Sequence, residues 1–208
     1  MPAPNTPGAR QIVRWFRRNR LPPPAVFLQV GVGVARELKI FTLAWPMTRY
    51  IGCEPNRHFL KTPWNNIGYP GLLLPVAVAD YIGVGVFYER KRHRAASGLI
   101  PRVDGYHHTY DVPVTTLDSI QATYGPLTVA ADGCNGSLFL WLDCEGGEEA
   151  ALKGGLNVLR AASFLNIEIR LEHGDDWLAP WLTGFSLAMT HSQTSDKYDA
   201  LYVRTSNE

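Results

Sequence analysis

The sequence has almost no excess of charge of either sign, because 20 Lys and Arg residues stand against 19 Asp and Glu in 208 residues. A net charge of +1 gives the molecule as a whole no electrostatic reason to bind a polyanion, so we expect no nucleic-acid partner. Long apolar runs are absent as well. None approaches the roughly 18 residues of a membrane span, and the N-terminus lacks the apolar core of a signal peptide. We therefore expect a cytoplasmic protein without stable membrane insertion.

Cysteine is also scarce. The chain has three cysteines, Cys53, Cys134 and Cys144, an odd number without Cys-x-x-Cys spacing. This pattern is typical of free thiols in a reducing compartment, and it argues against a disulfide framework. His107 and His108 are adjacent but have no matching third ligand, so we predict no metal site. Either histidine is a candidate general base or, alternatively, a surface loop residue.

The clearest local pattern is a strand, a helix and a second strand between residues 138 and 169. The apolar run Leu138 to Leu142 predicts a strand buried on both faces of a parallel sheet. Charged residues and two glycines follow at once, which predicts a tight turn and then a helix with negative charge in its first turn. Ala162 to Ile169 predicts the next buried strand. The expected apolar face of the intervening helix consists of Leu152, Leu156 and Leu159.

Asp143 and Glu145 stand directly after the first of these strands. Ligands of open α/β sheets bind beyond the carboxyl ends of the strands, so topology puts both carboxylates at a candidate site. We predict that they take part in catalysis. The alternative is a structural role, in which they cap the helix and fix the turn.

A second informative stretch is a glycine turn between a strand and a helix. Val26 to Val30 predicts a buried strand, and Gly31 and Gly33 predict a tight turn that can bring backbone N–H groups to a nucleotide-bearing cofactor. A further strand, predicted for Arg49 to Asn56, carries Glu54 about 20 residues beyond the glycines, where a carboxylate can hold ribose hydroxyls. The helix after the turn is expected to bury Val34, Leu38 and Phe41.

The identity of the cofactor depends on what is missing from this turn. The dinucleotide fingerprint requires a third glycine or alanine, and Arg36 stands at that position. A pyrophosphate needs the helix to approach closely, whereas an adenosyl group does not, so S-adenosylmethionine fits better than NAD. A third strand is predicted for Leu72 to Asp80. Its last two residues, Ala79 and Asp80, are expected near the adenine edge.

We predict two regions in the chain. Residues 1–24 form an N-terminal tail and a basic amphipathic helix, in which Ile12, Trp15 and Phe16 are interleaved with arginines. We interpret this helix as packing over an edge of the domain, with two alternatives: a lid over the substrate, and contact with a membrane surface or nucleic acid. Residues 25–208 form a single domain, since 208 residues suit one hydrophobic core.

The segment Val112 to Ile120 predicts a short strand that passes into a helix, with Thr115 or Thr116 as the N-cap. Asp118 then falls in the first turn, where a negative charge stabilises the helix dipole; the alternative is a role in the site. Near the C-terminus, residues 184–190 and 200–204 are apolar and flank a polar stretch, which predicts an antiparallel hairpin. A mostly parallel sheet closed by such a hairpin is more typical of methyltransferases than of dehydrogenases.

Four parts of the chain together resemble the FkbM-type S-adenosylmethionine-dependent methyltransferases. They are FLQVGVGVARE, YIGCEPN, VPVTTLDSI and, above all, LWLDCEGGEEAALKGG with FLNIEI and YDALYVR after it. The resemblance covers residues 25–204. It implies an α/β fold of the class I methyltransferase type, a Rossmann-like three-layer sandwich whose mostly parallel sheet is closed by a C-terminal antiparallel hairpin.

The resemblance also implies the cofactor, S-adenosylmethionine, and a set of residues around it. The glycines would cradle its methionine part, Glu54 its ribose, and the end of the third strand its adenine. The family generally has an acid where this chain has Gln29, which offers hydrogen bonds but no carboxylate to the cofactor's ammonium. The implied cofactor-binding residues are Gln29, Gly31, Gly33, Glu54, Pro55, Ala79 and Asp80.

The implied activity is O-methylation of a sugar, a glycan or a natural product, so the expected partner is a small-molecule or glycan acceptor. Asp143, Glu145 or His107 would accept the proton of the acceptor hydroxyl. One alternative is a non-catalytic binding module with a methyltransferase fold, which Gln29 favours. Another is an oxidoreductase with a nucleotide cofactor, which Arg36 disfavours. The sequence is compatible with a homo-oligomer.

Overall fold

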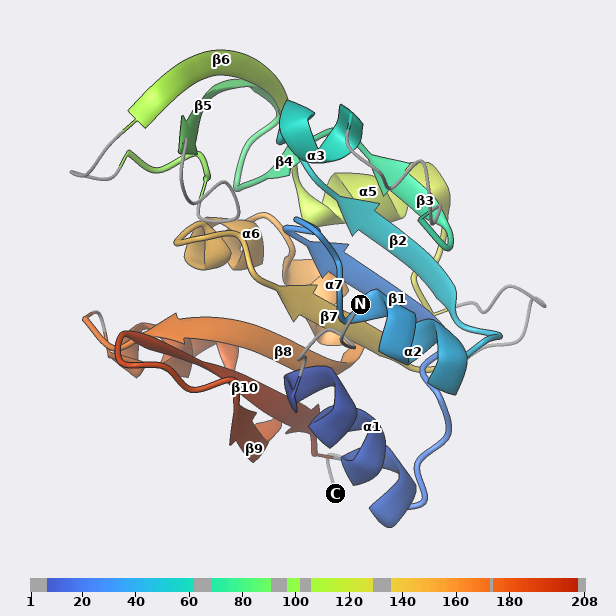
Figure 1. Cartoon of the computed structure of the whole chain (residues 1–208). Coiled ribbons are helices and arrows are strands. Elements are labelled where there is room, and N and C mark those ends of the chain that lie inside the picture. The colour runs from blue at the N-terminus through green and yellow to red at the C-terminus, as the bar shows by residue number, and fades with distance from the viewer. Residues whose placement is uncertain are drawn as a thin grey trace, which may run out of the picture.

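The computed structural model describes residues 7–61, 69–90, 97–101, 106–128, 136–172 and 174–205, except for the side chains of residues 7, 61, 106 and 107. Its centre is a seven-stranded sheet with the strand order β3-β2-β1-β7-β8-β10-β9 (Figure 1). The strands are β1 (Val26–Val30), β2 (Arg49–Cys53), β3 (Leu72–Leu74), β7 (Leu138–Leu142), β8 (Ala162–Arg170), β9 (Phe185–His191) and β10 (Lys197–Arg204).

This sheet has the predicted architecture. All neighbouring strands from β3 to β8 run parallel, and β10 lies antiparallel between β8 and β9. The C-terminal hairpin therefore closes a mostly parallel sheet, as the sequence predicts. The strand ranges predicted for residues 26–30 and 138–142 match β1 and β7.

Helices cover both faces of the sheet, which gives three layers (Figure 1). One face packs against α1 and α2, and the other against α5, α6, α7 and a short 3-10 helix, η2. Because both faces are covered, every residue of β1 and β7 is buried, and this is why their sequences are continuous apolar runs. The helices are α1 (Pro7–Arg18), α2 (Leu38–Ala44), α3 (Arg57–Lys61), α5 (Leu117–Tyr124), α6 (Glu148–Lys153), α7 (Leu156–Ala161) and η2 (Asp176–Trp181).

The N-terminal helix α1 is part of the core. Ile12, Val13 and Phe16 are buried against the sheet and α2. The ring of Phe16 lies 4.6 Å from that of Phe164 and 4.9 Å from that of Trp45, measured between centroids. These contacts agree with the interpretation of α1 as a packing helix. Among the described helices, none is long and apolar enough to cross a membrane.

A second, three-stranded sheet lies beside the first and corrects one prediction. Its order is β4-β6-β5, from β4 (Ala77–Val78), β5 (Gly83–Arg90) and β6 (Tyr106–Thr115). The single strand predicted for Leu72 to Asp80 is wrong, because β3 ends at Leu74 and β4 belongs to the other sheet. Pro75 separates the two, and proline has no N–H with which to continue a ladder.

Two predicted helices also differ from those observed. The helix expected to bury Leu152, Leu156 and Leu159 is divided into α6 and α7 at two glycines, which are poor helix formers, and Leu156 is 46% exposed. The helix after the glycine turn begins only at Leu38. Val34 therefore lies in the turn, where it is 51% exposed rather than buried.

Candidate functional site

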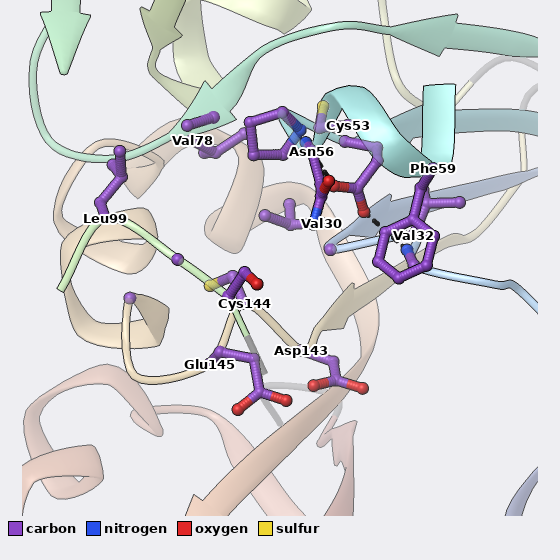
Figure 2. A pocket seen from close by; sticks show the side chains of 18 of the residues that line it. Val30, Val32, Cys53, Asn56, Phe59, Val78, Leu99, Asp143, Cys144 and Glu145 are labelled. Carbon is purple, nitrogen blue, oxygen red and sulfur yellow. Dashed lines mark hydrogen bonds between the residues drawn. The ribbon is translucent and has the colours of Figure 1, made fainter. Parts of the chain in front are cut away.

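A pocket of about 230 Å³ opens at the carboxyl ends of β1, β2 and β7 (Figure 2). Its wall is formed by the glycine turn after β1, residues 53–56 at the end of β2, residues 76–78 around β4, and residues 143–145 after β7. Segment 97–99 and Lys197 of β10 also line the pocket, together with Phe59, Phe87 and Gly147. This is the crevice in which α/β sheets of this type bind their ligands.

Glu54 is held in the pocket by backbone donors on both of its carboxylate oxygens. Its Oε2 accepts a hydrogen bond of 2.6 Å from the backbone N–H of Gly33, and its Oε1 accepts one of 2.7 Å from the backbone N–H of Asn56. Burial raises the pKa of Glu54 to about 7, although these backbone donors lower it. Each carboxylate oxygen keeps a second lone pair, so the oriented group is able to accept hydrogen bonds from the two hydroxyls of a ribose.

The two turn glycines have different surroundings. Gly31 has a φ of +80°, and a Cβ there would lie 1.7 Å from the backbone oxygen of Asp143, so only glycine allows β1 and β7 to approach at this point. Gly33 has a φ of +51°, and a Cβ there would meet nothing within 4 Å. Gly31 is therefore required for packing, whereas the space over Gly33 belongs to the pocket.

Gln29 lies outside the pocket lining among the described residues, and its side chain is turned to the face covered by α2. It is 1% exposed, and its Nε2 donates a hydrogen bond of 2.8 Å to Oε1 of Glu37. Glu37 stands immediately before α2 and lines the pocket. The carboxylate that the Gln29 amide contacts is therefore one that lines the pocket.

Asp143 and Glu145 lie side by side at one end of the pocket (Figure 2). Together with Glu168 of β8 they form a cluster in which one oxygen of each carboxylate lies within 4.8 Å of the others. Burial raises the pKa of Asp143 well above its ordinary value, and the negative charges of Glu168, Glu145 and Asp199 raise it further. Such a carboxyl holds its proton more strongly than a carboxyl in water does.

Two cations of the chain contact this acidic cluster. Nη2 of Arg170 lies 2.5 Å from Oε2 of Glu145 and 3.5 Å from Oε1 of Glu168. Nζ of Lys197 lies 3.5 Å from Oε1 of Glu145 and also bonds to Glu168. Burial acts to lower the pKa of Lys197, but the surrounding carboxylates raise it above its ordinary value, so the ammonium stays charged. The three carboxylates have the chemistry of a metal site, and the chain's own cations neutralise part of their charge.

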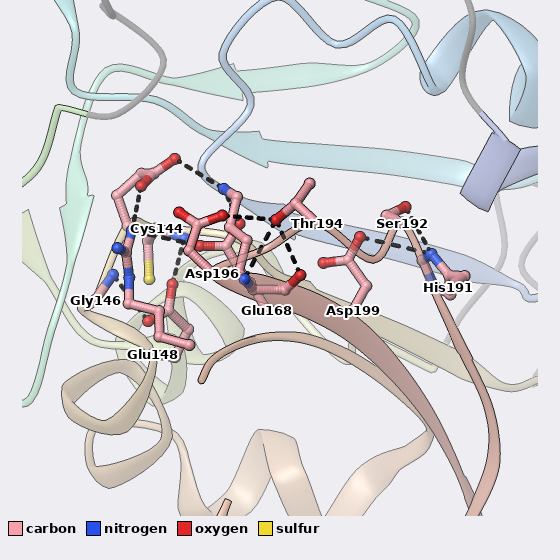
Figure 3. A network of polar contacts seen from close by, with 12 residues as sticks. Cys144, Gly146, Glu148, Glu168, His191, Ser192, Thr194, Asp196 and Asp199 are labelled. Atoms are coloured by element: carbon pink, nitrogen blue, oxygen red, sulfur yellow. Dashed lines mark hydrogen bonds and ion pairs between the residues drawn. The ribbon is translucent and has the colours of Figure 1, made fainter. Parts of the chain in front are cut away.

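The loop that carries Asp143 and Glu145 is fixed by Glu148 (Figure 3). The Oε1 of Glu148 accepts a hydrogen bond of 2.8 Å from the backbone N–H of Cys144. Its Oε2 accepts one of 2.9 Å from the backbone N–H of Gly146. Glu145 itself has a φ of +60°, which is uncommon outside glycine. The acid in the first turn of α6 thus holds a strained loop against the pocket, beyond its favourable position in the helix dipole.

The other wall of the pocket is apolar and comes from the second sheet. Val78 of β4, Phe87 of β5 and Leu99 line it, which makes a surface for a flat ring. Ala79 and Asp80, predicted beside the adenine, follow β4 directly and do not line the pocket among the described residues, whereas Ala77 and Val78 of β4 do. Pro55 does line it. The side chain of His107 lies outside the described residues, as does Cys134.

Three site residues were not predicted from the sequence: Glu37, Glu168 and Lys197. Glu37 belongs to the motif FLQVGVGVARE, but its spacing of eight residues from Gln29 matches no local rule. Glu168 lies within an apolar strand, and a lone acid in such a run is a signal of burial with a partner. The position of Lys197 depends on the pairing of β10 with β8, which the sequence pattern does not specify.

The charges of the pocket indicate the kind of ligand that fits. Among the described residues that line it, the carboxylates are Glu37, Glu54, Asp143 and Glu145, and the cation is Lys197, which is already paired. An anionic pyrophosphate would be repelled here, whereas a cationic sulfonium is attracted. The parts of S-adenosylmethionine have matching features in the pocket. The oriented carboxylate of Glu54 suits the ribose, the open space over Gly33 suits the methionine part, and the apolar wall suits the adenine.

Comparison with known proteins agrees with this chemistry. Residues 29–196 match the model of the methyltransferase FkbM domain. Among solved structures, the putative methyltransferase yhhF from Escherichia coli is 12% identical with a TM-score of 0.52, covering 100% of this chain and 92% of its own. Precorrin-6y C5,15-methyltransferase from Geobacter metallireducens is 10% identical with a TM-score of 0.51, covering 95% and 87%.

A third solved structure contains the cofactor. Magnesium protoporphyrin IX methyltransferase from Synechocystis with bound SAM is 11% identical with a TM-score of 0.50, and the match covers 95% of this chain and 78% of that one. No curated protein matches the sequence. At these identities the solved structures show the class I methyltransferase fold alone. The family model shows more: this chain belongs to the FkbM methyltransferase family, whose cofactor is S-adenosylmethionine.

Proposed function

We propose that this methyltransferase acts on a hydroxyl oxygen of a sugar, a glycan or a hydroxylated natural product, and that Asp143 is the general base. The observation that carries the proposal is the carboxylate of Asp143 at the pocket wall. Within the described part of the chain its side chain makes no hydrogen bond, while its neighbour Glu145 is paired with Arg170. An unpaired carboxylate in the pocket is available to a proton from the substrate.

The reaction needs a base because a hydroxyl is a poor nucleophile. When bound, S-adenosylmethionine supplies a methyl carbon attached to a positively charged sulfur. Asp143 accepts the hydroxyl proton as the acceptor oxygen forms its bond to that carbon and the carbon–sulfur bond breaks. The bound cofactor would keep the electron pair of the broken bond on its sulfur and leave as a neutral thioether. The pocket contributes mainly by holding the oxygen close and in line.

The environment of Asp143 suits this role. Burial and the charges of Glu168 and Glu145 raise its pKa, and Lys197 opposes them in part. Once it is ionised, a carboxylate with a raised pKa is a stronger base than an ordinary one, so Asp143 acts in the fraction of molecules in which it has lost its proton. Glu145 is held by Arg170 and Lys197, so it supports the charge of the cluster and is less available as a base.

The test is an acceptor screen with matched analogues. The full-length protein is incubated with S-adenosylmethionine and a panel of sugars, oligosaccharides and phenolic or polyketide-like alcohols, and the demethylated cofactor product is quantified. Each active acceptor is then compared with its deoxy analogue, and the position of the methyl group is determined by mass spectrometry. We expect turnover only where the hydroxyl is present. Methylation on nitrogen or carbon would overturn the assignment of an oxygen acceptor.

A further inference from the structure

The end of β1 has a polar pair in which the carboxylate belongs to the second residue. Gln29 is 1% exposed and donates its Nε2–H to Oε1 of Glu37 at 2.8 Å. The turn between them folds back, so that Glu37, eight positions later, reaches the pocket that Gln29 itself does not line. The amide of Gln29 thus fixes the direction of a carboxylate at the pocket wall.

The other pocket carboxylates already have functions or partners. Glu54 is bound by the backbone N–H groups of Gly33 and Asn56 beside the space for the ribose. Glu145 is paired with Arg170 and Lys197 at the opposite end. Glu37 makes no ion pair within the described residues, and the side chain that donates to it is the neutral amide of Gln29. Asp143, the fourth pocket carboxylate, is assigned above to the proton of the acceptor. Glu37 is therefore the pocket carboxylate that is left for a cationic group of the cofactor.

We propose that Glu37 binds the ammonium of the methionine part of S-adenosylmethionine. This assignment rests on the cofactor use described above. Burial raises the pKa of Glu37, and a cationic ligand offsets that cost, because an opposite charge favours the ionised form.

The role is a specific recognition of charge, and it differs from a structural role in a measurable way. If Glu37 only supported Gln29, its replacement would lower the affinity for every adenosyl ligand to a similar degree. If it binds the ammonium, the loss is confined to ligands that carry one. S-adenosylhomocysteine and its deamino analogue, which keeps the carboxylate and the adenosine, differ only in that group.

The experiment is calorimetric titration of the full chain with these two ligands. Glu37→Gln keeps a side chain that can still accept from Gln29, so we expect the fold to be retained, as checked by thermal unfolding. The expected result is about a tenfold to hundredfold weaker affinity for S-adenosylhomocysteine and no change for the deamino analogue, the size of a lost charge-assisted hydrogen bond. Glu37→Asp keeps the charge and should retain a preference for the ammonium ligand.

The matched control is Glu149→Gln on α6, which removes an exposed carboxylate that is paired with Lys153 and does not line the pocket. Both affinities should equal those of the unmodified protein. Equal weakening of the two ligands by Glu37→Gln, or no weakening of either, would overturn the assignment while leaving the cofactor itself established. Failure of the unmodified protein to bind S-adenosylhomocysteine would instead overturn the proposed methyl transfer, and this inference with it.

Discussion

The carboxylate of Glu54 and the backbone N–H of Gly33 are joined by a hydrogen bond of 2.6 Å across the mouth of the pocket. The two residues come from the ends of β1 and β2, which lie next to each other and run parallel. The bond therefore links the glycine turn after β1, which we propose holds the methionine part of the cofactor, to the acid after β2, which we propose holds its ribose. This relationship makes Glu54 the first residue to change.

Glu54→Gln is expected to reduce the affinity for S-adenosylhomocysteine by at least tenfold. The variant loses the charge that strengthens two hydrogen bonds to the ribose, and its amide N–H faces one of the backbone donors at Gly33 and Asn56. Calorimetric titration measures the affinity, and circular dichroism checks that the fold is kept. Unchanged affinity would show that the ribose does not contact Glu54.

Asp143→Asn is expected to lower kcat by about 10²- to 10⁴-fold, the usual contribution of a general base. Binding of S-adenosylhomocysteine should change little, because this product lacks the methyl and the positive charge that face Asp143. The two readouts separate catalysis from binding. Full turnover in the variant would remove Asp143 from the role of base, and a parallel loss of binding would reassign it to the cofactor site.

The affinity for the deamino analogue of S-adenosylhomocysteine is expected to fall as the pH is lowered through about 7, the pKa of Glu54. The affinity falls in this direction because the Glu54 carboxylate is ionised above its pKa. Protonation below that pH takes away one of the oxygens that accept hydrogen bonds from the ribose hydroxyls. The limiting slope is about tenfold per pH unit. Use of the deamino ligand removes any contribution of Glu37. A pH-independent affinity would contradict the prediction, and Glu54→Gln supplies the flat reference curve.

The two glycines of the turn should respond differently to alanine. Gly31→Ala would put a methyl 1.7 Å from the backbone oxygen of Asp143, so we expect a loss of stability of at least about 3 kcal/mol. Gly33→Ala meets open space and costs only the strain of a positive φ, about 1–2 kcal/mol. Its methyl occupies the pocket, so cofactor affinity should fall more than stability. Thermal unfolding and calorimetry, applied to both variants, distinguish the two effects.

Asp118 connects two helices. Its position in the first turn predicts that it stabilises its own helix, α5, whereas its carboxylate accepts hydrogen bonds of 3.1 Å and 3.0 Å from the backbone N–H groups of Asn157 and Val158, at the start of α7. Asp118→Ala should therefore reduce stability by about 1 kcal/mol, or lower the melting temperature by about 2–4 °C. Glu149→Ala, which removes an exposed i,i+4 pair, is the control and should have a smaller effect.

Much of the fold was predictable because it depends on local patterns. The buried runs Val26–Val30 and Leu138–Leu142 are apolar throughout because both faces of the sheet are covered, and that composition is visible in the sequence. Thr116 also caps α5 as one of the two predicted candidates, since its hydroxyl accepts from the N–H of Ser119 at 3.1 Å. The broken third strand was missed because the apolar pattern continues across Pro75 while the chain changes sheets.

The sequence by itself determined the layered α/β class, the glycine turn, the acid at the end of β2 and the two acids after β7, because each follows from residues close together in the chain. Only the tertiary structure decided which carboxylate faces which charge. Lys197 and Glu168 lie 29 positions apart and meet because β10 pairs with β8. Glu37 reaches the pocket because a turn folds it back onto Gln29. Electrostatic contacts depend on distance in space, and distance along the chain does not encode them.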